Sequence, residues 1–422
     1  MFPSKVARAA GSGASVPVEC CQICANEKLE TVLSLGFMPP VNQMTLTGAV
    51  PRQLPWFPTT LLYCGNCQLV QLGLVVDPVI IFPPEYPYTS GMTKLLRDNF
   101  AELYAESSKM LGLTENDLIV DIGSNDGTLI SNFQNRGHRI LGIEPTDVAK
   151  IASERGIPTI QRYFNKEVAR EVKANHGAAK VITAANCFAH IEDVHAIVEG
   201  ILEMLAPDGV FISESHYLIK LLDTLQYDTI YHEHLRYYSV GSLKALLGMH
   251  GLEVFHARPI PSHGGSIRVY AGRKGTRPVQ PSVKQMLDTE PRGDAMRSRL
   301  EKFRDDVMLS KLRLLGMIRD IKEKGGRIVG ISAPSRASTL VNYVGLDEAL
   351  IDYVCEIQGS LKIGKSMPGT LIPVVEESRL FSDQPDAAII FSWHIADELA
   401  PKLRAKGYNG ALITPLPVPR SL

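Results

Sequence analysis

Leu118-Ile-Val-Asp-Ile-Gly-Ser-Asn-Asp-Gly127 is the stretch that decides the fold of this 422-residue chain. The apolar residues up to Ile122 predict a buried strand, and the glycines that follow predict a tight turn into a helix. Glycine at such a turn also lets the backbone approach a ligand closely. The candidate cofactor-binding residues here are Asp121, Gly123, Ser124, Asn125, Asp126 and Gly127. A turn with a purely structural role is the alternative.

Strands and helices alternate on both sides of this stretch. Strands are expected at 140–144, 180–185 and 209–213, and helices at 93–111, 128–135, 149–155 and 194–205. This alternation predicts a doubly wound, mostly parallel sheet of the Rossmann-like class. A charged helical stretch (283–324) then leads into a second α/β unit, with strands near 326–331, 351–354, 387–391 and 410–414. The two units share an architecture but no sequence repeat.

The cysteine spacing predicts a metal site near the N-terminus. Cys21-Gln-Ile-Cys24 and Cys64-Gly-Asn-Cys67 are two CxxC knuckles that flank a Pro-rich, strand-like segment too short to be held by burial alone. Four thiolates suit a closed tetrahedral zinc site, which supplies folding energy and leaves no open position for catalysis. Free cysteines and a redox CxxC are the alternatives. We treat Cys20 as a bystander.

The acids around the glycine turn bear on the cofactor. Glu144 ends the next expected strand, roughly 20 residues after the turn, where a ribose diol is bound in dinucleotide folds. A loop that binds a pyrophosphate favours GxGxxG spacing without an acid in the turn. Asp126 lies inside this turn, which suits a ligand with an ammonium and a sulfonium. We therefore predict S-adenosylmethionine (SAM) rather than NAD as the cofactor.

Ionisable and aromatic residues cluster in Tyr231-His-Glu-His234. A histidine beside a carboxylate is the usual general base near neutral pH. The cluster therefore predicts a reaction centre, with a helix whose polar face is simply satisfied as the alternative.

Six motifs occur in an order that resembles one family. They are the two knuckles, Gly123-Ser-Asn-Asp-Gly-Thr-Leu129, Gly142-Ile-Glu-Pro145, Ala185-Asn-Cys-Phe-Ala-His190, Ile230-Tyr-His-Glu-His234 and His263-Gly-Gly-Ser-Ile-Arg268. From about residue 20 to residue 418 the chain resembles the three-domain, zinc-containing, SAM-dependent sugar C-methyltransferases. That family methylates C3 of nucleotide-activated 4-keto-6-deoxy sugars.

The resemblance implies roles for particular residues. It places Tyr231, Glu233 and His234 at the reaction centre, lined by His190 and by the tyrosines of Glu85-Tyr-Pro-Tyr88, with Tyr86 expected at the chemistry and Tyr88 at the substrate. It extends the cofactor site to Glu144, Pro145 and Asn186. It makes Cys21, Cys24, Cys64 and Cys67 the zinc ligands.

Two further turns are candidate substrate sites. His263, Gly264, Gly265 and Ser266 with Arg268 look like a strand-edge turn whose amides and guanidinium can hold a diphosphate, with a plain hairpin turn as the alternative. Arg336 lies in the C-terminal turn 330–337, which is often richer in glycine in relatives. Side chains at Ser332 and Ala337 narrow the approach to a ligand there, so the nucleotide and the sugar class stay open.

Methylation at carbon needs a carbanion equivalent, and the proton α to a ketone is the accessible one. We expect His234, assisted by Glu233, to remove that proton from a keto sugar. Tyr231, His190 or Tyr86 would donate a hydrogen bond to the enolate oxygen. An O- or N-methyltransferase acting on another small metabolite, and a non-catalytic zinc and Rossmann scaffold, are the alternatives.

Charge and hydropathy narrow the partners. With 44 basic and 45 acidic residues the formal net charge is −1, which gives no electrostatic footprint for nucleic acid or an anionic membrane. No apolar run is long enough to span a bilayer. We expect a cytoplasmic enzyme of small molecules, monomeric or homodimeric. The expected organisation is a disordered leader (1–18), a zinc-binding lobe (19–80), a SAM-binding domain (81–275) and a C-terminal α/β substrate-binding domain (276–422).

Overall fold

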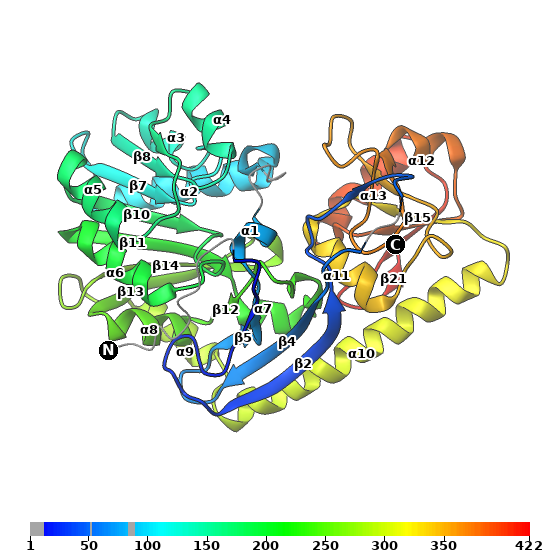
Figure 1. Ribbon diagram of the computed structural model, residues 1–422, viewed down its shortest axis with the longest axis horizontal. Coiled ribbons are helices and arrows are strands. Elements are labelled where there is room, and N and C mark those ends of the chain that lie inside the picture. The colour runs from blue at the N-terminus through cyan, green and yellow to red at the C-terminus, as the bar shows by residue number, and fades with distance from the viewer. Residues whose placement is uncertain (1–11, 51–52, 83–88) are drawn as a thin grey trace.

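The computed structural model describes residues 12–50, 53–82 and 89–422, and Figure 1 shows three units built around separate sheets. Tyr86 and Tyr88, and residues 1–11 of the expected leader, lie outside the described residues. The α/β fold class with an N-terminal cysteine lobe and a second C-terminal α/β domain is confirmed.

The central sheet has seven strands and is mostly parallel, as the sequence predicts, and it adds β9, β13 and β14 to the four strands expected. Its order is β13 (Leu252–Ile260), β14 (Ser266–Arg273), β11 (Leu205–His216), β10 (Ala179–Ala185), β7 (Leu118–Ile122), β8 (Arg139–Ile143) and β9 (Thr159–Ile160). Only β14 runs against the others. The order reverses between β10 and β7, and such a switch point opens a ligand crevice at the carboxyl ends of the strands.

Two separate layers of side chains cover the faces of this sheet, because successive strand residues point to opposite sides. Ile119 of β7 packs with Phe100 and Leu103 of α2 (Lys94–Leu111). Leu118 and Val120 belong to the other layer, which includes side chains from three helices. These helices are α5 (Lys166–His176), α6 (Val194–Met204) and α8 (Val240–Met249). All five residues of β7 are buried, as a central parallel strand requires.

The N-terminal lobe is a small antiparallel sheet that is not made by the lobe alone. Its order is β12 (Arg236–Tyr237), β5 (Val70–Leu72), β4 (Phe57–Cys64) and β2 (Leu29–Met38). The register pairs Arg236 with Gln71 and Tyr237 with Val70. The fourth strand therefore comes from a segment more than a hundred residues beyond the expected lobe (19–80), directly after the Tyr231–His234 cluster.

The four knuckle cysteines meet at one end of this lobe. All four sulfur atoms lie within 4.8 Å of one another, with 3.4 Å between the sulfurs of Cys21 and Cys67 and 3.5 Å between those of Cys24 and Cys64. Sulfurs bound to one tetrahedral zinc at about 2.3 Å lie somewhat less than 4 Å apart. The donor set and its spacing therefore fit zinc, and Cys20 is outside it.

The C-terminal unit carries a six-stranded sheet. Its order is β18 (Val374–Glu376), β16 (Val354–Glu356), β15 (Ile328–Ile331), β19 (Ala387–Ile390), β20 (Ala411–Thr414) and β21 (Arg420–Ser421), with only β21 antiparallel. Its helices are α11 (Ser335–Val344), α12 (Ser378–Asp383) and α13 (Ala396–Ala405).

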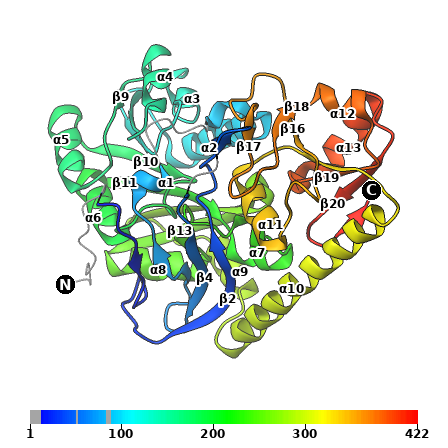
Figure 2. The same cartoon turned by 45° about the vertical axis from the view of Figure 1, so that its right-hand side comes forward.

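The charged stretch expected as one helix over 283–324 is two helices. α9 (Pro281–Thr289) ends before Pro291 and Gly293, and α10 (Asp294–Lys322) begins after them. Pro291 cannot donate a helical hydrogen bond, and Gly293 has a positive φ of 54°. α9 packs on β13 and α8 of the central unit, whereas α10 runs on below β2 toward the C-terminal unit (Figures 1 and 2).

Arg268 corrects one expectation from the sequence. Its side chain is fully buried on β14, where the guanidinium donates to Glu214 Oε1 and Glu106 Oε2, both at 2.6 Å, and to the Asn99 side chain at 3.1 Å. A side chain with these partners joins β14 to β11 and α2 and is not free to hold a diphosphate. The spacing to His263 suggested a ligand site, but the guanidinium of Arg268 is buried and bonded to protein groups.

Zinc removal should unfold the lobe first. We expect one zinc per chain by elemental analysis. Cys64→Ser should lower the thermal midpoint of the lobe by roughly 5 °C or more, since each kcal/mol lost lowers the midpoint of a domain of 60–100 residues by roughly 4–8 °C. Cys20→Ser is the matched control and should change neither quantity. Protein purified without chelator that contains no zinc would contradict the assignment.

Arg268→Gln should destabilise the central unit strongly. It leaves the buried Glu214 carboxylate without its cation, and breaking a buried pair costs about 3–5 kcal/mol. Arg258→Gln removes a more exposed partner of the same Glu106 and should cost about 1 kcal/mol or less. Urea unfolding followed by circular dichroism measures both. Equal stability of Arg268→Gln and the parent protein would restore Arg268 as a candidate ligand-binding residue.

Candidate active site

The glycine turn after β7 has the geometry of a ligand-binding loop. Gly123 and Gly127 have φ values of 69° and 77°, which side chains rarely tolerate. A Cβ on Gly123 would lie 2.8 Å from the Cβ of Cys187, and one on Gly127 would lie 2.4 Å from Ile157 Cδ1. Both positions therefore require glycine, as the sequence indicates.

Glu144 reaches from the end of β8 to this turn. Its Oε2 accepts a hydrogen bond from the Asn125 amide at 3.0 Å, and its Oε1 accepts from the Thr146 amide and hydroxyl at 2.9 and 2.6 Å. The carboxylate thus sets the loop against β8 at the mouth of the crevice. Pro145 follows it, and Ser124 lies buried against Gly142.

Asp126 is not placed as the sequence predicts. Its carboxylate is 1% exposed and accepts hydrogen bonds from the Gly91 amide (3.0 Å), the Thr128 hydroxyl (2.7 Å) and Arg155 (3.2 Å). These bonds tie the loop to the start of α2. The carboxylate of Asp126 thus holds the loop, and its contact with a cationic ligand stays a prediction.

Two more candidate residues lie at the ends of β7 and β10. Asp121 accepts a hydrogen bond from the Thr183 hydroxyl at 2.6 Å, and burial raises its pKa to about 7. Asn186 follows β10 with a φ of 59°, and its amide donates to the Glu214 carbonyl at 2.9 Å. Backbone strain at such a strand end is a common mark of a functional site.

Four histidines from distant segments meet beside this crevice. The ring centre of His234 lies 5.0 Å from the ring centre of His190 and 4.8 Å from that of His216. The ring centres of His216 and His263 are 5.6 Å apart. The ring of Tyr231 lies 4.0 Å from His234. Of these residues only His216 was not a candidate in the sequence, although it ends the strand of Ser213-Glu-Ser-His216.

The hydrogen bond of His234 fixes its tautomer. Its Nδ1 lies 2.7 Å from the Thr229 carbonyl oxygen. A carbonyl can only accept, so Nδ1 carries the proton and Nε2 keeps its lone pair. The sequence predicts Glu233 as the partner of His234, but the group that orients the ring is this backbone carbonyl. A carbonyl partner leaves no sequence signal, because every residue has one.

Burial sets the protonation of the cluster. Desolvation, and then the charge of His190, hold the pKa of His234 well below its usual value, and burial lowers the pKa of His190 and His263 to about 4. Burial, reinforced by Glu233, raises the pKa of Tyr231 well above its ordinary value of 10. At neutral pH the histidines are therefore neutral and Tyr231 keeps its hydroxyl proton.

A buried ion pair fastens the segment before His234 to the C-terminal unit. Arg336 Nε and Nη2 donate to the two carboxylate oxygens of Asp228 at 2.7 and 2.8 Å. Trp393 Nε1 donates to Asp228 Oδ2 at 2.8 Å, and the Arg336 guanidinium lies 5.1 Å from the Trp393 ring centre. Arg336 also lies 3.5 Å from the His263 carbonyl, so it does reach the candidate site.

The turn at 263–266 uses much of its polar surface internally. The Gly264 carbonyl accepts a hydrogen bond from the Gln226 side chain at 2.8 Å. The Ser262 carbonyl accepts two, one from the Gly265 amide and one from the Ser266 hydroxyl at 3.0 Å. His263, which has a φ of 55°, is the residue of this turn whose side chain contacts the histidine cluster, through the ring of His216. A diphosphate cradle made by all four residues with Arg268 is therefore not what the structure contains.

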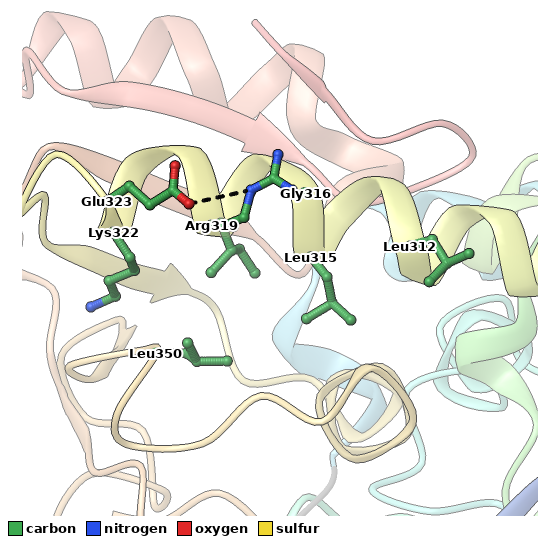
Figure 3. A pocket seen from close by; sticks show the side chains of 8 residues that line it. Leu312, Leu315, Gly316, Arg319, Lys322, Glu323 and Leu350 are labelled. Carbon is green, nitrogen blue, oxygen red and sulfur yellow. Dashed lines mark ion pairs between the residues drawn. The ribbon is translucent and has the colours of Figure 1, made fainter.

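A groove of about 520 Å³ elsewhere on the surface contains none of the candidate residues. It lies beside the last part of α10, between the face of Leu312, Leu315 and Arg319 and the side chain of Leu350 (Figure 3). No helix within the described ranges is long and apolar enough to cross a bilayer.

Family models match three consecutive parts of the chain. A zinc binding domain matches residues 21–82, a methyltransferase domain matches 88–257, and a C-methyltransferase C-terminal domain matches 261–417. The first contains the four knuckle cysteines, and the second contains the glycine turn, Glu144 and His234. The third begins just before His263. The zinc and SAM predicted from the sequence are confirmed by these matches together with the cysteine cluster.

Individual relatives agree with the family models. The chain is 32% identical to the C-methyltransferase NovU of Streptomyces niveus over 96% of its own length and 97% of that protein. The solved PH0226 protein of Pyrococcus horikoshii OT3 is 14% identical, with a TM-score of 0.36 over 46% of this chain and 98% of that one. The solved glycopeptide N-methyltransferase MtfA is 12% identical, with a TM-score of 0.34 over 41% of this chain and 95% of that one. At these scores the two structures add nothing to the argument. From its near full-length match to NovU and its C-methyltransferase C-terminal domain, this SAM-dependent methyltransferase belongs to the zinc-containing sugar C-methyltransferase family.

Proposed function

We propose that this enzyme methylates the carbon α to the ketone of a nucleotide-activated 4-keto-6-deoxy sugar. The observation that carries the proposal is His234, a buried neutral imidazole held at Nδ1 with Nε2 free to accept a proton. Methylation of oxygen or nitrogen needs at most a base for an acidic proton. A water-poor site with a neutral base beside a protonated phenol suits the removal of a carbon-bound proton and the support of an enolate.

The proposed steps use these side chains as follows. His234 Nε2 takes the α proton, and the electron pair of the C–H bond moves toward the ketone oxygen. Tyr231, which keeps its proton at neutral pH, or His190 donates a hydrogen bond to that oxygen as it becomes negative. SAM, when bound, would supply the electrophilic methyl group that the α carbon takes, with the electron pair of the broken C–S bond left on sulfur as the neutral thioether of S-adenosylhomocysteine. The positive charge left on His234 rests against the Thr229 carbonyl dipole.

Glu233 retains a place in this proposal, although not as the partner of His234 Nδ1. It is 4% exposed, and its charge acts on Tyr231 by keeping the phenol protonated. Its carboxylate can accept a hydrogen bond from a sugar hydroxyl at the same centre. Tyr86 and Tyr88, which the family resemblance assigns to the centre and the substrate, stay predictions.

We assign the cofactor to the crevice at the ends of β7, β8 and β10. The backbone of 123–127 would pass close to it, Glu144 would meet the ribose hydroxyls, and Asp121, Pro145 and Asn186 would line the rest. On the acceptor side we assign Arg336, His263 and Gly264, which border the histidines. Two nitrogen atoms of the Arg336 guanidinium already donate to Asp228, so only part of the guanidinium would bind a substrate.

His234→Gln should lower the rate of methyl transfer by at least about 10²-fold, because the general base is lost. Exchange of the substrate's α proton with deuterated water should disappear in parallel, and thermal stabilisation by S-adenosylhomocysteine should remain. His176→Gln, at an exposed position, is the matched control and should behave as the parent enzyme. Mass spectrometry and NMR of the product locate the methyl group. A methyl group on oxygen or nitrogen would contradict the proposal.

The pH profile should show a base that titrates unusually low. Since the lowered pKa keeps His234 neutral, kcat/KM should stay level from alkaline pH down through 6.5, the ordinary histidine pKa, and fall only well below it. The residual activity of His234→Gln should lack this acid limb. An acid limb centred at or above pH 7 in the parent enzyme would exclude the buried neutral imidazole as the base.

A further inference from the structure

One segment of the zinc lobe leaves its own sheet and crosses to the C-terminal unit. We call residues 39–50, between β2 and β4, the lobe strap. Its β3 (Thr45–Leu46) pairs with β17 (Lys365–Ser366), and Gly369 lies against Pro39 and Trp56. Both views show this dark-blue segment reaching the orange C-terminal unit (Figures 1 and 2).

Asn42 of the strap touches the reaction centre. Its Nδ2 donates a hydrogen bond to Glu233 Oε1 at 2.6 Å, and its Oδ1 accepts one from the Ser335 hydroxyl at 2.9 Å. Ser335 begins α11, the helix that also carries Arg336. One amide thus links the zinc lobe, the catalytic segment and the C-terminal unit.

The two bonds of Asn42 are not independent. An amide donates only through nitrogen and accepts only through oxygen, and an ionised carboxylate only accepts, so Glu233 keeps the nitrogen of Asn42 toward itself and leaves the oxygen to accept from the Ser335 hydroxyl. With this end chosen, the amide meets the carboxylate as a donor. A buried carboxylate without donors is costly, and its conformation follows the donors it finds.

A cation stands near the same place. Lys362 Nζ donates to the Ala333 carbonyl at 2.6 Å, and the Ala333 amide donates to Glu356 Oε1 at 2.6 Å. Burial lowers the pKa of Lys362, while the charges of Glu356 and Glu233 oppose that shift. The Ser335 hydroxyl at the start of α11, and the ammonium of Lys362 that is bonded to Ala333 just before this helix, therefore both lie on the side of the site where Glu233 lies.

We infer that Asn42 is a positioning residue for the methyl transfer, which holds the Glu233 carboxylate in its working orientation through the Ser335 bond. This rests on the proposed function, in which Glu233 belongs to the reaction centre. It assigns to the zinc lobe a part in the chemistry beyond its metal: the lobe delivers a hydrogen-bond donor to a residue 191 positions away in sequence.

A double-mutant cycle tests the inference. Asn42→Ala should lower kcat about tenfold and change KM little, whereas the same change on a Glu233→Gln background should cost about twofold or less. Coupled neighbours show such non-additivity, and independent sites do not. The assay follows labelled methyl transfer to a panel of nucleoside-diphosphate 4-keto-6-deoxy sugars. Additive losses in the cycle would overturn the inference.

Asn42→Asp adds a readout that a merely structural residue would not change. The new carboxyl faces Glu233, so it can donate a hydrogen bond only when protonated, and its pKa is raised by the neighbouring charge. The activity ratio of Asn42→Asp to Asn42→Ala should therefore rise as pH falls from about 8 to about 6. A ratio independent of pH would count against the inference.

Controls separate folding and the wider proposal from this one. Zinc content and thermal midpoint of each variant show whether the lobe is intact, and Asn409→Ala, at an exposed asparagine, should match the parent enzyme. Ser335→Ala should reproduce part of the Asn42→Ala loss. The atom that carries the methyl group is recorded separately, so a product methylated on oxygen would overturn the proposed function while the cycle still decides the role of Asn42.

Discussion

The pairing of Asp228 with Arg336 is the interaction on which the rest of the site depends. Both side chains are buried, and the fork of Arg336 occupies both carboxylate oxygens. Removing either partner would leave an uncompensated buried charge, so separating the two units that they join has a high free-energy cost. The Thr229 carbonyl, next to Asp228, orients His234. The ion pair between the units is thus one residue away from the carbonyl that fixes the tautomer of the histidine.

The fold and the metal ligands could be predicted from the sequence because their signals are local. A buried strand before a glycine turn, alternating elements and paired knuckles each depend on neighbouring residues, and 118–127, Cys21 and Cys64 lie where such patterns place them. The residue types of the reaction centre were predictable for the same reason: Tyr231 and His234 are close in sequence.

The remaining features depend on partners that are distant in sequence. Arg268 was predicted to face a ligand, but Glu214 and Glu106 surround it only once β14 lies between β13 and β11. The hydrogen bond from the Gly91 amide to Asp126 likewise depends on a partner that is distant in sequence. A charged residue in a motif therefore indicates that the site needs a charged side chain at that position. Whether that side chain binds a ligand or another part of the protein depends on the topology.

Strand β12 has a consequence for how such enzymes can diversify. Arg236 and Tyr237 complete the sheet of the zinc lobe, and β3 of the lobe strap pairs with β17 of the C-terminal unit in a separate two-stranded sheet. The units therefore exchange strands across the boundaries that the sequence suggests. A recombination crossover near residue 80 would join a foreign β5 to a resident β12. Chimeras built by exchanging whole lobes should therefore lose a matched strand pair, and new acceptor preferences should arise more readily from substitutions within an intact chain.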